Sequence, residues 1–516
     1  MKIKFSTKLF LIVLFLCISA LSCSEMGSSG IAEVVQTTTT AETIETPILT
    51  MTPTPTKTPP PDGFTEYLTK SGDTLPVIAA HFGMDAADII SDHVLDPKAL
   101  IDAGTRLLVR DILSETTPSD ILFPDAAVVF SPEAVGFDIQ SFADEQAGFL
   151  STYTEMMTRG TTFASEIIKQ LALEFSINPR ILLALMEVES GWVSGTPENS
   201  DQTLYPFGYI RKDRGGVYNQ TGWAIRYLSE GFYGWRAGTL TELTFLDGTT
   251  LRLAPSLNAG TAAVMNFFAQ MHTRAEWQEL VYGENGISNT YTELFGDPWE
   301  RAVGIEPLFP AGITQPELNL PFPVNEKWNL TGGPHSSWGR YGPRVALDFA
   351  PPLDSPGCGN SIHWTTAAAA GRVVRVGSGV VVLDLDRDGY EQTGWVLVYM
   401  HVANSGRVDL DAYLEVDDII GHPSCEGGSS SGIHVHLARK YNGEWVLADG
   451  GIPFVMSGYQ ASNGDKPCDY AYYGFCSGTL DNGEKTVTAD PYGNFWTAIY
   501  RPDSAPKYLS TPTPKP

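Results

Sequence analysis

Positive charge is scarce in this chain. Its 516 residues include 33 lysines and arginines against 60 aspartates and glutamates, which gives a net charge of −27. A surface this acidic repels phosphates, so the composition argues against binding to nucleic acids and against electrostatic docking on anionic lipid. The length is too great for one hydrophobic core and predicts a multidomain protein of about three or four domains.

The apolar run near the N-terminus is too short to span a membrane comfortably. The stretch "LFLIVLFLCISAL" follows a lysine-containing start, which is typical of a signal peptide over residues 1–22. It ends in "ALSC", which resembles the bacterial lipobox, although Ala20 stands where leucine is usual. The resemblance implies a lipid anchor on Cys23, and ordinary signal-peptide cleavage nearby is the alternative. We therefore expect an exported lipoprotein on the cell surface.

Cysteine is rare, and its spacing argues against a cysteine zinc site. Apart from two in the N-terminal segment, the cysteines are Cys358, Cys425, Cys468 and Cys476, and no CxxC pair occurs. An even number of cysteines in an exported chain predicts disulfides, and four of them allow three pairings. The short segment "CDYAYYGFC" favours Cys468–Cys476, which leaves Cys358–Cys425.

The composition changes several times along the chain and predicts a multidomain order. Threonine and proline are frequent at 23–62, as in an extended linker. The expected regions after it are a small α+β module at 63–112, a second linker at 113–137, a mostly helical domain at 138–318, a mainly-β domain with an antiparallel sheet at 319–460, and a C-terminal extension with a proline-rich tail at 461–516.

The module at 63–112 begins with a strand and a Ser-Gly-Asp-Thr turn. The stretch "LPVIAAHFG" predicts a helix that ends at a glycine, followed by a second helix and a closing strand after Gly104. The run from Gly72 to Leu75, together with Phe82 and Gly83, resembles a LysM domain. The resemblance implies a βααβ fold that binds N-acetylglucosamine-containing glycans such as peptidoglycan. A generic small α+β module is the alternative.

The region at 138–318 shows helical periodicity, for example in "PRILLALMEVESGW". That segment and the later "PSLNAG" resemble lysozyme-like and lytic transglycosylase domains. The resemblance implies that Glu189 is a general acid for glycan cleavage. The family's Gly-Leu-Met-Gln stretch is missing, so the alternative is a scaffold without catalysis.

Four side chains of the β domain suit a metal site. In "SGIHVHL", His434 and His436 are two residues apart, so both side chains point to one face of a strand. His401 ends the strand "VLVYMHV", and Asp348 lies in the apolar strand "VALDFA", where a carboxylate needs a cation or donors. Imidazoles and a carboxylate suit zinc, which keeps a position for water when it is catalytic. Two histidines on a solvated face are the alternative.

At these motifs the region 319–460 resembles the lysostaphin-type (LytM-like) zinc endopeptidases, which cleave peptide cross-links of peptidoglycan. The resemblance implies that zinc is held by His335, Asp348 and His436, that His434 is the general base, and that His401 stabilises the tetrahedral intermediate. The family commonly has a much shorter spacing between first histidine and aspartate than the twelve residues found here. No other histidine of the domain precedes Asp348, so we interpret "SSWGRYGPRVAL" as a loop inserted between two ligands.

The segment "DLDRDGYEQTGW" begins like a calcium-binding loop, with Asp384, Asp386 and Asp388. Its twelfth position, which requires an acid, is Trp395, so the EF-hand pattern fails. We interpret the segment as an acidic hairpin turn, with calcium as the alternative.

The sequence as a whole predicts a zinc endopeptidase that hydrolyses peptidoglycan cross-links. The LysM-like module would retain it on glycan strands, and Cys23 would attach it to the membrane. One alternative is a non-enzymatic peptidoglycan-binding protein or amidase activator. Another is a bifunctional enzyme whose helical domain also cleaves glycan.

Overall fold

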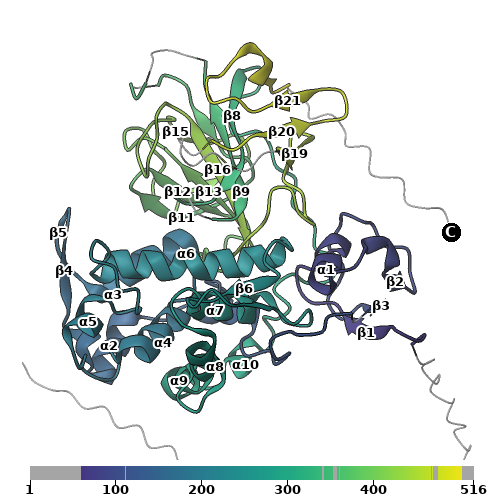
Figure 1. Cartoon of the computed structure of the whole chain (residues 1–516). Helices are drawn as coiled ribbons and strands as arrows, with labels where there is room; N and C mark the ends of the chain where they lie inside the picture. Colours follow the sequence, from purple (N-terminus) through teal and green to yellow (C-terminus); the bar gives the residue numbers. More distant parts are fainter. Residues whose placement is uncertain are drawn as a thin grey trace, which may run out of the picture. The chain divides into compact units, whose positions relative to one another are not determined.

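The computed structural model describes residues 60–110, 112–339, 342–352, 357–359, 361–465, 468 and 475–502. The predicted signal peptide, Cys23, nearly all of the first linker and the proline-rich tail lie outside these residues. Within the described ranges, no helix combines the length and the apolar character needed to cross a membrane. Figure 1 shows a small α+β module, a helical region and a β region along this part of the chain.

The small module is a three-stranded antiparallel sheet with one α-helix. The strand β3 (Arg106–Val109) pairs with both β1 (Thr65–Leu68) and β2 (Ile90–Ser91). The helix α1 (Leu75–Phe82) has a proline in its first turn and ends at Gly83, whose φ of 65° is left-handed. The core of the module is Tyr67, Ile78, Phe82, Ile101, Leu107 and Val109.

The second helix expected in this module is not formed. A single 3-10 turn, η1 (Ala86–Asp88), leads directly into β2. The β-branched pair Ile89 and Ile90 favours extended backbone, and Pro97 disfavours helical backbone at the residue before it. After α1, the βααβ pattern has a second helix and one strand. The module instead has the turn η1 and the two short strands β2 and β3.

The helical region is built around α7, whose eleven residues are all buried. The longest helix, α6, packs along it, and Gly231 allows the close approach because a Cβ there would lie 2.6 Å from Ala263 Cα. Two hairpins and three 3-10 turns accompany the helices. The elements are η2 (Asp125–Ala127), η3 (Pro132–Ala134), α2 (Ile139–Gln146), η4 (Phe149–Ser151), β4 (Thr154–Met157), β5 (Gly160–Phe163), α3 (Ala164–Phe175), α4 (Pro179–Ser190), α5 (Ser200–Leu204), α6 (Val217–Arg236), β6 (Glu242–Thr244), β7 (Thr250–Arg252), α7 (Ala259–Ala269), α8 (Arg274–Tyr282), α9 (Ile287–Phe295) and α10 (Pro298–Ala302).

Part of the segment expected as a second linker, 113–137, belongs to this helical core. Phe123, Val128 and Val129 are at most 1% exposed and pack with the helices. Val129 also forms a β-bridge with Ile177. The apolar stretch around these residues has to be buried, so the helical region begins earlier in the chain than residue 138.

The β region contains a large antiparallel sheet of nine strands. Their order is β14-β11-β12-β13-β16-β9-β8-β22, and β17 pairs with β16. Alternate residues of each central strand point to opposite faces, so Val398 and Ala438 pack with the helical region while Leu397 and Leu437 join a separate apolar core. The strands are β8 (Lys327–Ser336), β9 (Arg344–Ala350), β11 (Gly371–Gly377), β12 (Val380–Asp384), β13 (Trp395–Met400), β14 (Tyr413–Leu414), β16 (Val435–Tyr441), β17 (Glu444–Trp445) and β22 (Ala498–Tyr500), with a separate pair, β10 (Thr365–Thr366) and β15 (Ile419–Gly421).

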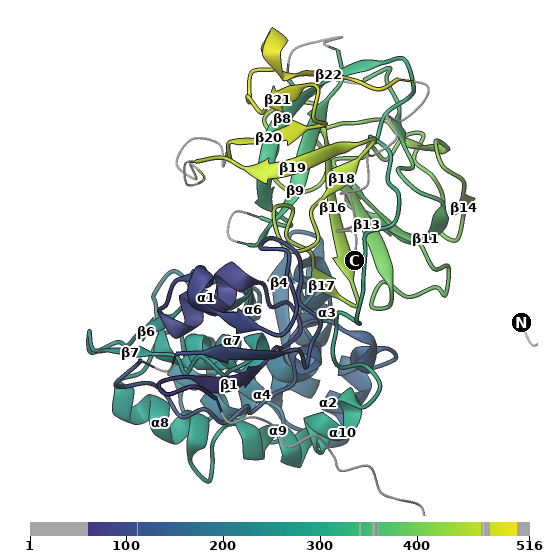
Figure 2. The ribbon, with the colours of Figure 1, turned by 90° about the vertical axis from the view of Figure 1, so that its right-hand side faces the viewer.

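The C-terminal extension completes this region. A second sheet has the order β18-β19-β20-β21, and the last strand, β22, pairs with β8 after the turn η5 (Phe495–Thr497) (Figure 2). This sheet crosses the boundary expected at residue 460. Both expected disulfides are formed, Cys358–Cys425 and Cys468–Cys476. The strands of the sheet are β18 (Val455–Met456), β19 (Tyr459–Asn463), β20 (Gly478–Asp481) and β21 (Thr486–Thr488).

The acidic segment after β12 is a hairpin connection, as the sequence predicts. It joins the antiparallel strands β12 and β13. Asp384 accepts backbone N–H groups from Arg387 and Gly389, at 3.1 and 2.8 Å. These contacts give Asp384 a structural role in the turn, and calcium binding stays the alternative for Asp384, Asp386 and Asp388.

Candidate metal centre and active site

Three neighbouring strands bring four of the predicted residues together. In β16, His436 lies opposite Met400 of β13 on one side and opposite Asp348 of β9 on the other. His434 comes directly before β16, and His401 comes directly after β13. The pairing of these strands therefore brings the four side chains together, although His434 lies just outside the strand expected to hold it.

The long gap between His335 and Asp348 is a β-hairpin. The strand β8 continues past His335, and β9 begins at Arg344. His335 lies opposite Ala346, two residues before Asp348, and Asp348 itself lies opposite Gly332 across a bulged register. The segment that we interpreted as an inserted loop is therefore partly strand, at Ser336 and Arg344–Leu347, while 337–339 and 342–343 lie outside the strands. Antiparallel pairing lets two residues be far apart in sequence and close in space.

Three side chains direct one polar atom each toward a common point. Nε2 of His335 lies 3.0 Å from Nδ1 of His436. Oδ1 of Asp348 lies 3.3 Å from Nε2 of His335 and 3.2 Å from Nδ1 of His436. Ligands bound about 2.0–2.2 Å from a tetrahedral zinc are about 3.3–3.6 Å from one another, which is close to these distances. The three atoms therefore fit a metal ion.

Backbone carbonyls determine which ring nitrogens face this point. Nδ1 of His335 donates to the carbonyl of Gly333 at 2.8 Å, and Nε2 of His436 donates to that of Ser337 at 3.1 Å. Because a carbonyl only accepts, the two facing nitrogens carry lone pairs in the neutral rings. Lone pairs this close repel unless a cation or a proton lies between them. Asp348 Oδ1 is buried without a hydrogen-bond partner, which a metal ion would explain.

Burial and neighbouring charges shift the pKa values of the site. Burial raises the pKa of Asp348, but the nearby His335 and His434 outweigh it and hold that pKa well below its usual range. Burial lowers the pKa of His436 and, together with the neighbouring imidazoles, lowers the pKa of His401 to about 3. The pKa of His335 is lowered by burial and raised, on balance, by the Asp348 carboxylate. A charged carboxylate and a neutral His436 are the forms that bind metals.

His401 and His434 lie beside the three converging side chains. Their ring centroids are 4.4 Å apart, and His434 Nε2 lies 3.7 Å from Asp348 Oδ1. Nδ1 of His401 donates to the carbonyl of Glu426 at 3.0 Å, and Nδ1 of His434 donates to that of Gly432 at 2.9 Å. Each ring therefore presents Nε2 as a proton acceptor when it is neutral.

The residues that orient the four imidazoles were not among the predicted site residues. All four acceptors are backbone carbonyls, which every residue carries, so residue type does not reveal them. The glycine-rich stretch "CEGGSSSG" before His434 was the available signal, because two of the four acceptors, Glu426 and Gly432, lie within it.

Glu189, the predicted general acid of the helical region, lies in the last turn of α4 and has a hydrogen-bond partner. Its side chain is 6% exposed, and Oε1 lies 2.9 Å from Nε2 of His272. Burial raises the pKa of Glu189, while the hydrogen bond with His272 lowers it. Gly208 packs against the carboxylate, since a Cβ there would lie 2.3 Å from Oε2. The pairing with His272 gives the buried carboxylate of Glu189 a hydrogen-bond partner, and glycan cleavage by Glu189 stays a prediction.

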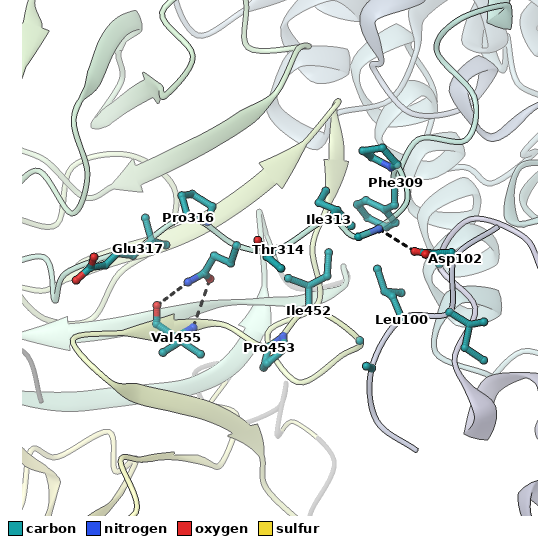
Figure 3. Close-up of a pocket in the computed structure, with 18 of the residues that line it drawn as sticks. Leu100, Asp102, Phe309, Ile313, Thr314, Pro316, Glu317, Ile452, Pro453 and Val455 are labelled. Carbon is teal, nitrogen blue, oxygen red and sulfur yellow. Dashed lines mark hydrogen bonds between the residues drawn. The ribbon is translucent and has the colours of Figure 1, made fainter. Parts of the chain in front are cut away.

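A separate pocket of about 750 Å³ lies elsewhere in the molecule (Figure 3). Its lining comes from the small module and from segments 309–318 and 451–458, and it includes none of the five predicted site residues. Within it, Gln315 bonds both the backbone N–H and the carbonyl of Val455, at 3.3 and 2.7 Å. The pocket is therefore distinct from the histidine site.

Parts of this chain are similar to known proteins. The model of the LasA N-terminal domain matches residues 121–309, which is the helical region. Protease LasA of Pseudomonas aeruginosa is 27% identical over 351 residues, which cover 65% of this chain and 80% of that protein. Beta-lytic metalloendopeptidase of Lysobacter enzymogenes is 27% identical over 161 residues, or 30% of this chain and 86% of that protein. The M23 metalloprotease pseudoalterin, a solved structure, is 26% identical with a TM-score of 0.28 and covers 37% of this chain and 100% of its own.

The converging histidines and aspartate, taken with these likenesses, make the chain a metalloendopeptidase. Its helical region is similar to the LasA N-terminal domain, and 65% of the chain is similar to protease LasA. The helical region is similar to the LasA N-terminal domain, so its likeness to lysozyme stays a prediction. The LysM assignment of the small module stays a prediction as well.

Proposed function

We propose that the protein is a zinc-dependent endopeptidase that hydrolyses peptide cross-links of bacterial peptidoglycan. The observation that carries this proposal is the convergence of His335, His436 and Asp348, with their facing atoms at most 3.3 Å apart. Two imidazoles and one carboxylate form a donor set that zinc prefers. The substrate class rests on the resemblance of "SGIHVHL" to the lysostaphin-type endopeptidases.

The remaining two histidines would do the acid–base work. A bound zinc would polarise the scissile carbonyl and lower the pKa of a bound water. His434 is the proposed general base, because the carbonyl of Gly432 holds its Nδ1–H and leaves Nε2 to accept a proton near Asp348. His401 is proposed to stabilise the tetrahedral intermediate. Since its Nδ1–H is bonded to Glu426, it can donate to an oxyanion only after Nε2 has taken up a proton.

The rest of the chain is proposed to place this site on the cell wall. The LysM-like run from Gly72 to Leu75 supports glycan retention by the small module. The apolar N-terminal run and Cys23 support export and a lipid anchor, which would be the protein's only attachment to the membrane. The threonine- and proline-rich segment after Cys23 would act as a spacer between anchor and enzyme.

Two variants test the proposed roles. Purified protein should carry about one zinc per chain, and it should convert cross-linked muropeptides to shorter products in a mass-spectrometric digest. His434→Ala should lose this activity and keep the zinc, because His434 is not a ligand. His363→Ala, which changes a histidine of the same region outside the site, is the matched control and should keep both. Full activity in His434→Ala would refute its role as the base.

The alternative of a non-enzymatic wall-binding protein or amidase activator fits the site poorly. A protein that has lost catalysis has no need to keep its metal ligands, whereas all five predicted side chains are present and three of them converge. The alternative of a second, glycan-cleaving activity depends on Glu189 alone, and its pairing with His272 does not require catalysis.

A further inference from the structure

His401 has an unusual backbone conformation. Its φ is 62°, in the left-handed region that residues with a side chain seldom adopt. A conformation of this kind persists at a functional site only where the surrounding structure holds it. The contacts of His401 therefore indicate what places its ring beside His434.

The segment 424–426 (Ser-Cys-Glu) contacts the backbone on both sides of the histidine pair. The backbone N–H of Ser424 donates to the carbonyl of His401 at 2.6 Å, and its hydroxyl donates to the same carbonyl at 3.0 Å. The carbonyl of Ser424 accepts the N–H of His434 at 3.5 Å. Ser424 is 8% exposed, so water competes little for these bonds.

Glu426 of the same segment holds the ring of His401. Its carbonyl accepts Nδ1–H of that ring, and its own N–H donates to the Ser424 hydroxyl at 3.0 Å. Its carboxylate accepts the N–H of Asn404 at 2.9 Å, which joins the segment to the loop that follows His401. Backbone and ring of His401 are thus held by one short segment.

The carbonyl of Glu426 packs against Gly379, which lies in the turn between β11 and β12. A Cβ at Gly379 would lie 2.3 Å from that carbonyl oxygen. The carbonyl of Gly379 also accepts the N–H of Val402 at 3.0 Å. Between Ser424 and Glu426, Cys425 is bound to Cys358. The acceptor of the His401 ring is therefore fixed from several directions.

We propose that segment 424–426, backed by Gly379, is a positioning element for His401. It sets the tautomer and the direction of the ring and acts on the reaction only through that ring. The inference rests on the role proposed above for His401. None of the bonds just described involves a metal ligand, so metal binding should not depend on them.

The sharpest test compares two glycine substitutions. Gly379→Ala places a Cβ against the carbonyl of Glu426, whereas Gly483→Ala meets nothing within 4 Å, and the two glycines have similar φ values of 76° and 82°. Both variants thus carry the same backbone strain, and only the first moves the acceptor of His401. Gly379→Ala should lower kcat on cross-linked muropeptide dimers about 10- to 100-fold, with KM and bound zinc unchanged. Gly483→Ala should keep the wild-type kcat.

A second pair of variants avoids the risk that Gly379→Ala fails to fold. Glu426 is exposed, so Glu426→Ala should fold, and it should lower kcat by less than Gly379→Ala because it removes one of several supports. Glu426→Gln keeps an acceptor oxygen for Asn404 and should restore kcat. Asp418→Ala removes a similar exposed carboxylate, which accepts the N–H of Glu415 at 2.7 Å, and should have no effect.

A double variant separates positioning from general damage. In the His401→Ala background, Gly379→Ala should cause no further loss of kcat, because its effect passes through a ring that is no longer there. A further loss, or a wild-type kcat in Gly379→Ala and Glu426→Ala while His401→Ala is impaired, would overturn the positioning role alone. A wild-type kcat in His401→Ala itself would instead refute the proposed role of His401, and the inference would fall with it.

Discussion

Replacing Arg236 with methionine should destabilise the protein by about 3–5 kcal/mol, the usual effect of breaking a buried ion pair. Arg236 is at the end of α6, and its side chain is 6% exposed. Its guanidinium lies 2.8 Å from the carboxylates of both Asp125 and Glu444, which are 3% exposed. It also donates to the carbonyl of Ser71. One cation therefore joins the module, the helical region and the β region, and its loss leaves two carboxylates buried without a counter-ion.

The size and the pH dependence of this effect can both be measured. At about 2.1 cal/mol/K per residue over roughly 450 residues, the expected loss lowers the melting temperature by about 3–5 °C. Burial raises the pKa of Glu444 to about 7 even beside Arg236. A raised pKa gives stability that is present at low pH and lost as the pH rises through it, so the variant should be more impaired at pH 8 than at pH 5.

The assay is thermal unfolding followed by tryptophan fluorescence, with Arg236→Met compared with the wild type at both pH values. The triple variant Arg236→Met, Asp125→Asn, Glu444→Gln removes the buried charges along with their partner and should recover much of the lost stability. A melting temperature within 1 °C of the wild type for Arg236→Met, or a loss that is larger at pH 5, would refute the reasoning.

Three further variants test other parts of the account. His335→Ala should lose bound zinc, as measured by metal analysis, because it removes one of three converging donors; retention of a full zinc equivalent would remove His335 from the ligand set. Glu391→Gln should cost about 3 kcal/mol at pH 7 and little at pH 2 in urea unfolding. Burial raises the pKa of Glu391, but Lys440 and Arg375 outweigh it and lower that pKa to about 2. The stability that a lowered pKa provides is lost as the pH falls through that value. Glu189→Ala should reduce the melting temperature, since it leaves His272 without its partner, and should leave glycan products unchanged; a change in those products would support a second activity.

The local sequence predicted the strand positions of the site well. A histidine pair two residues apart, a histidine at a strand end and a carboxylate in an apolar strand each limit where a side chain can point. His436 and Asp348 lie on the paired strands β16 and β9, and His434 and His401 lie directly beside the ends of β16 and β13. The disulfides followed from the spacing of four cysteines.

Features that depend on pairing between distant segments were harder to predict. The gap between His335 and Asp348 looked like a loop because its glycines, serines and arginines are typical of surfaces, but both of its ends, Ser336 and Arg344–Leu347, belong to paired strands. The expected second helix of the module was overridden by Ile89 and Ile90, which favour extended backbone. Phe123 belongs to the helical core through contacts with helices that are distant in the sequence.

The most direct test of the central claim is one digest of cross-linked peptidoglycan by the purified protein, analysed by mass spectrometry. It is run as purified, with a chelator, and with zinc added back after chelation. We predict that cross-linked muropeptides are converted to uncross-linked ones, that the chelator abolishes this conversion, and that zinc restores it. Cross-links that persist in the untreated sample, or cleavage that continues in the chelated one, would contradict the account.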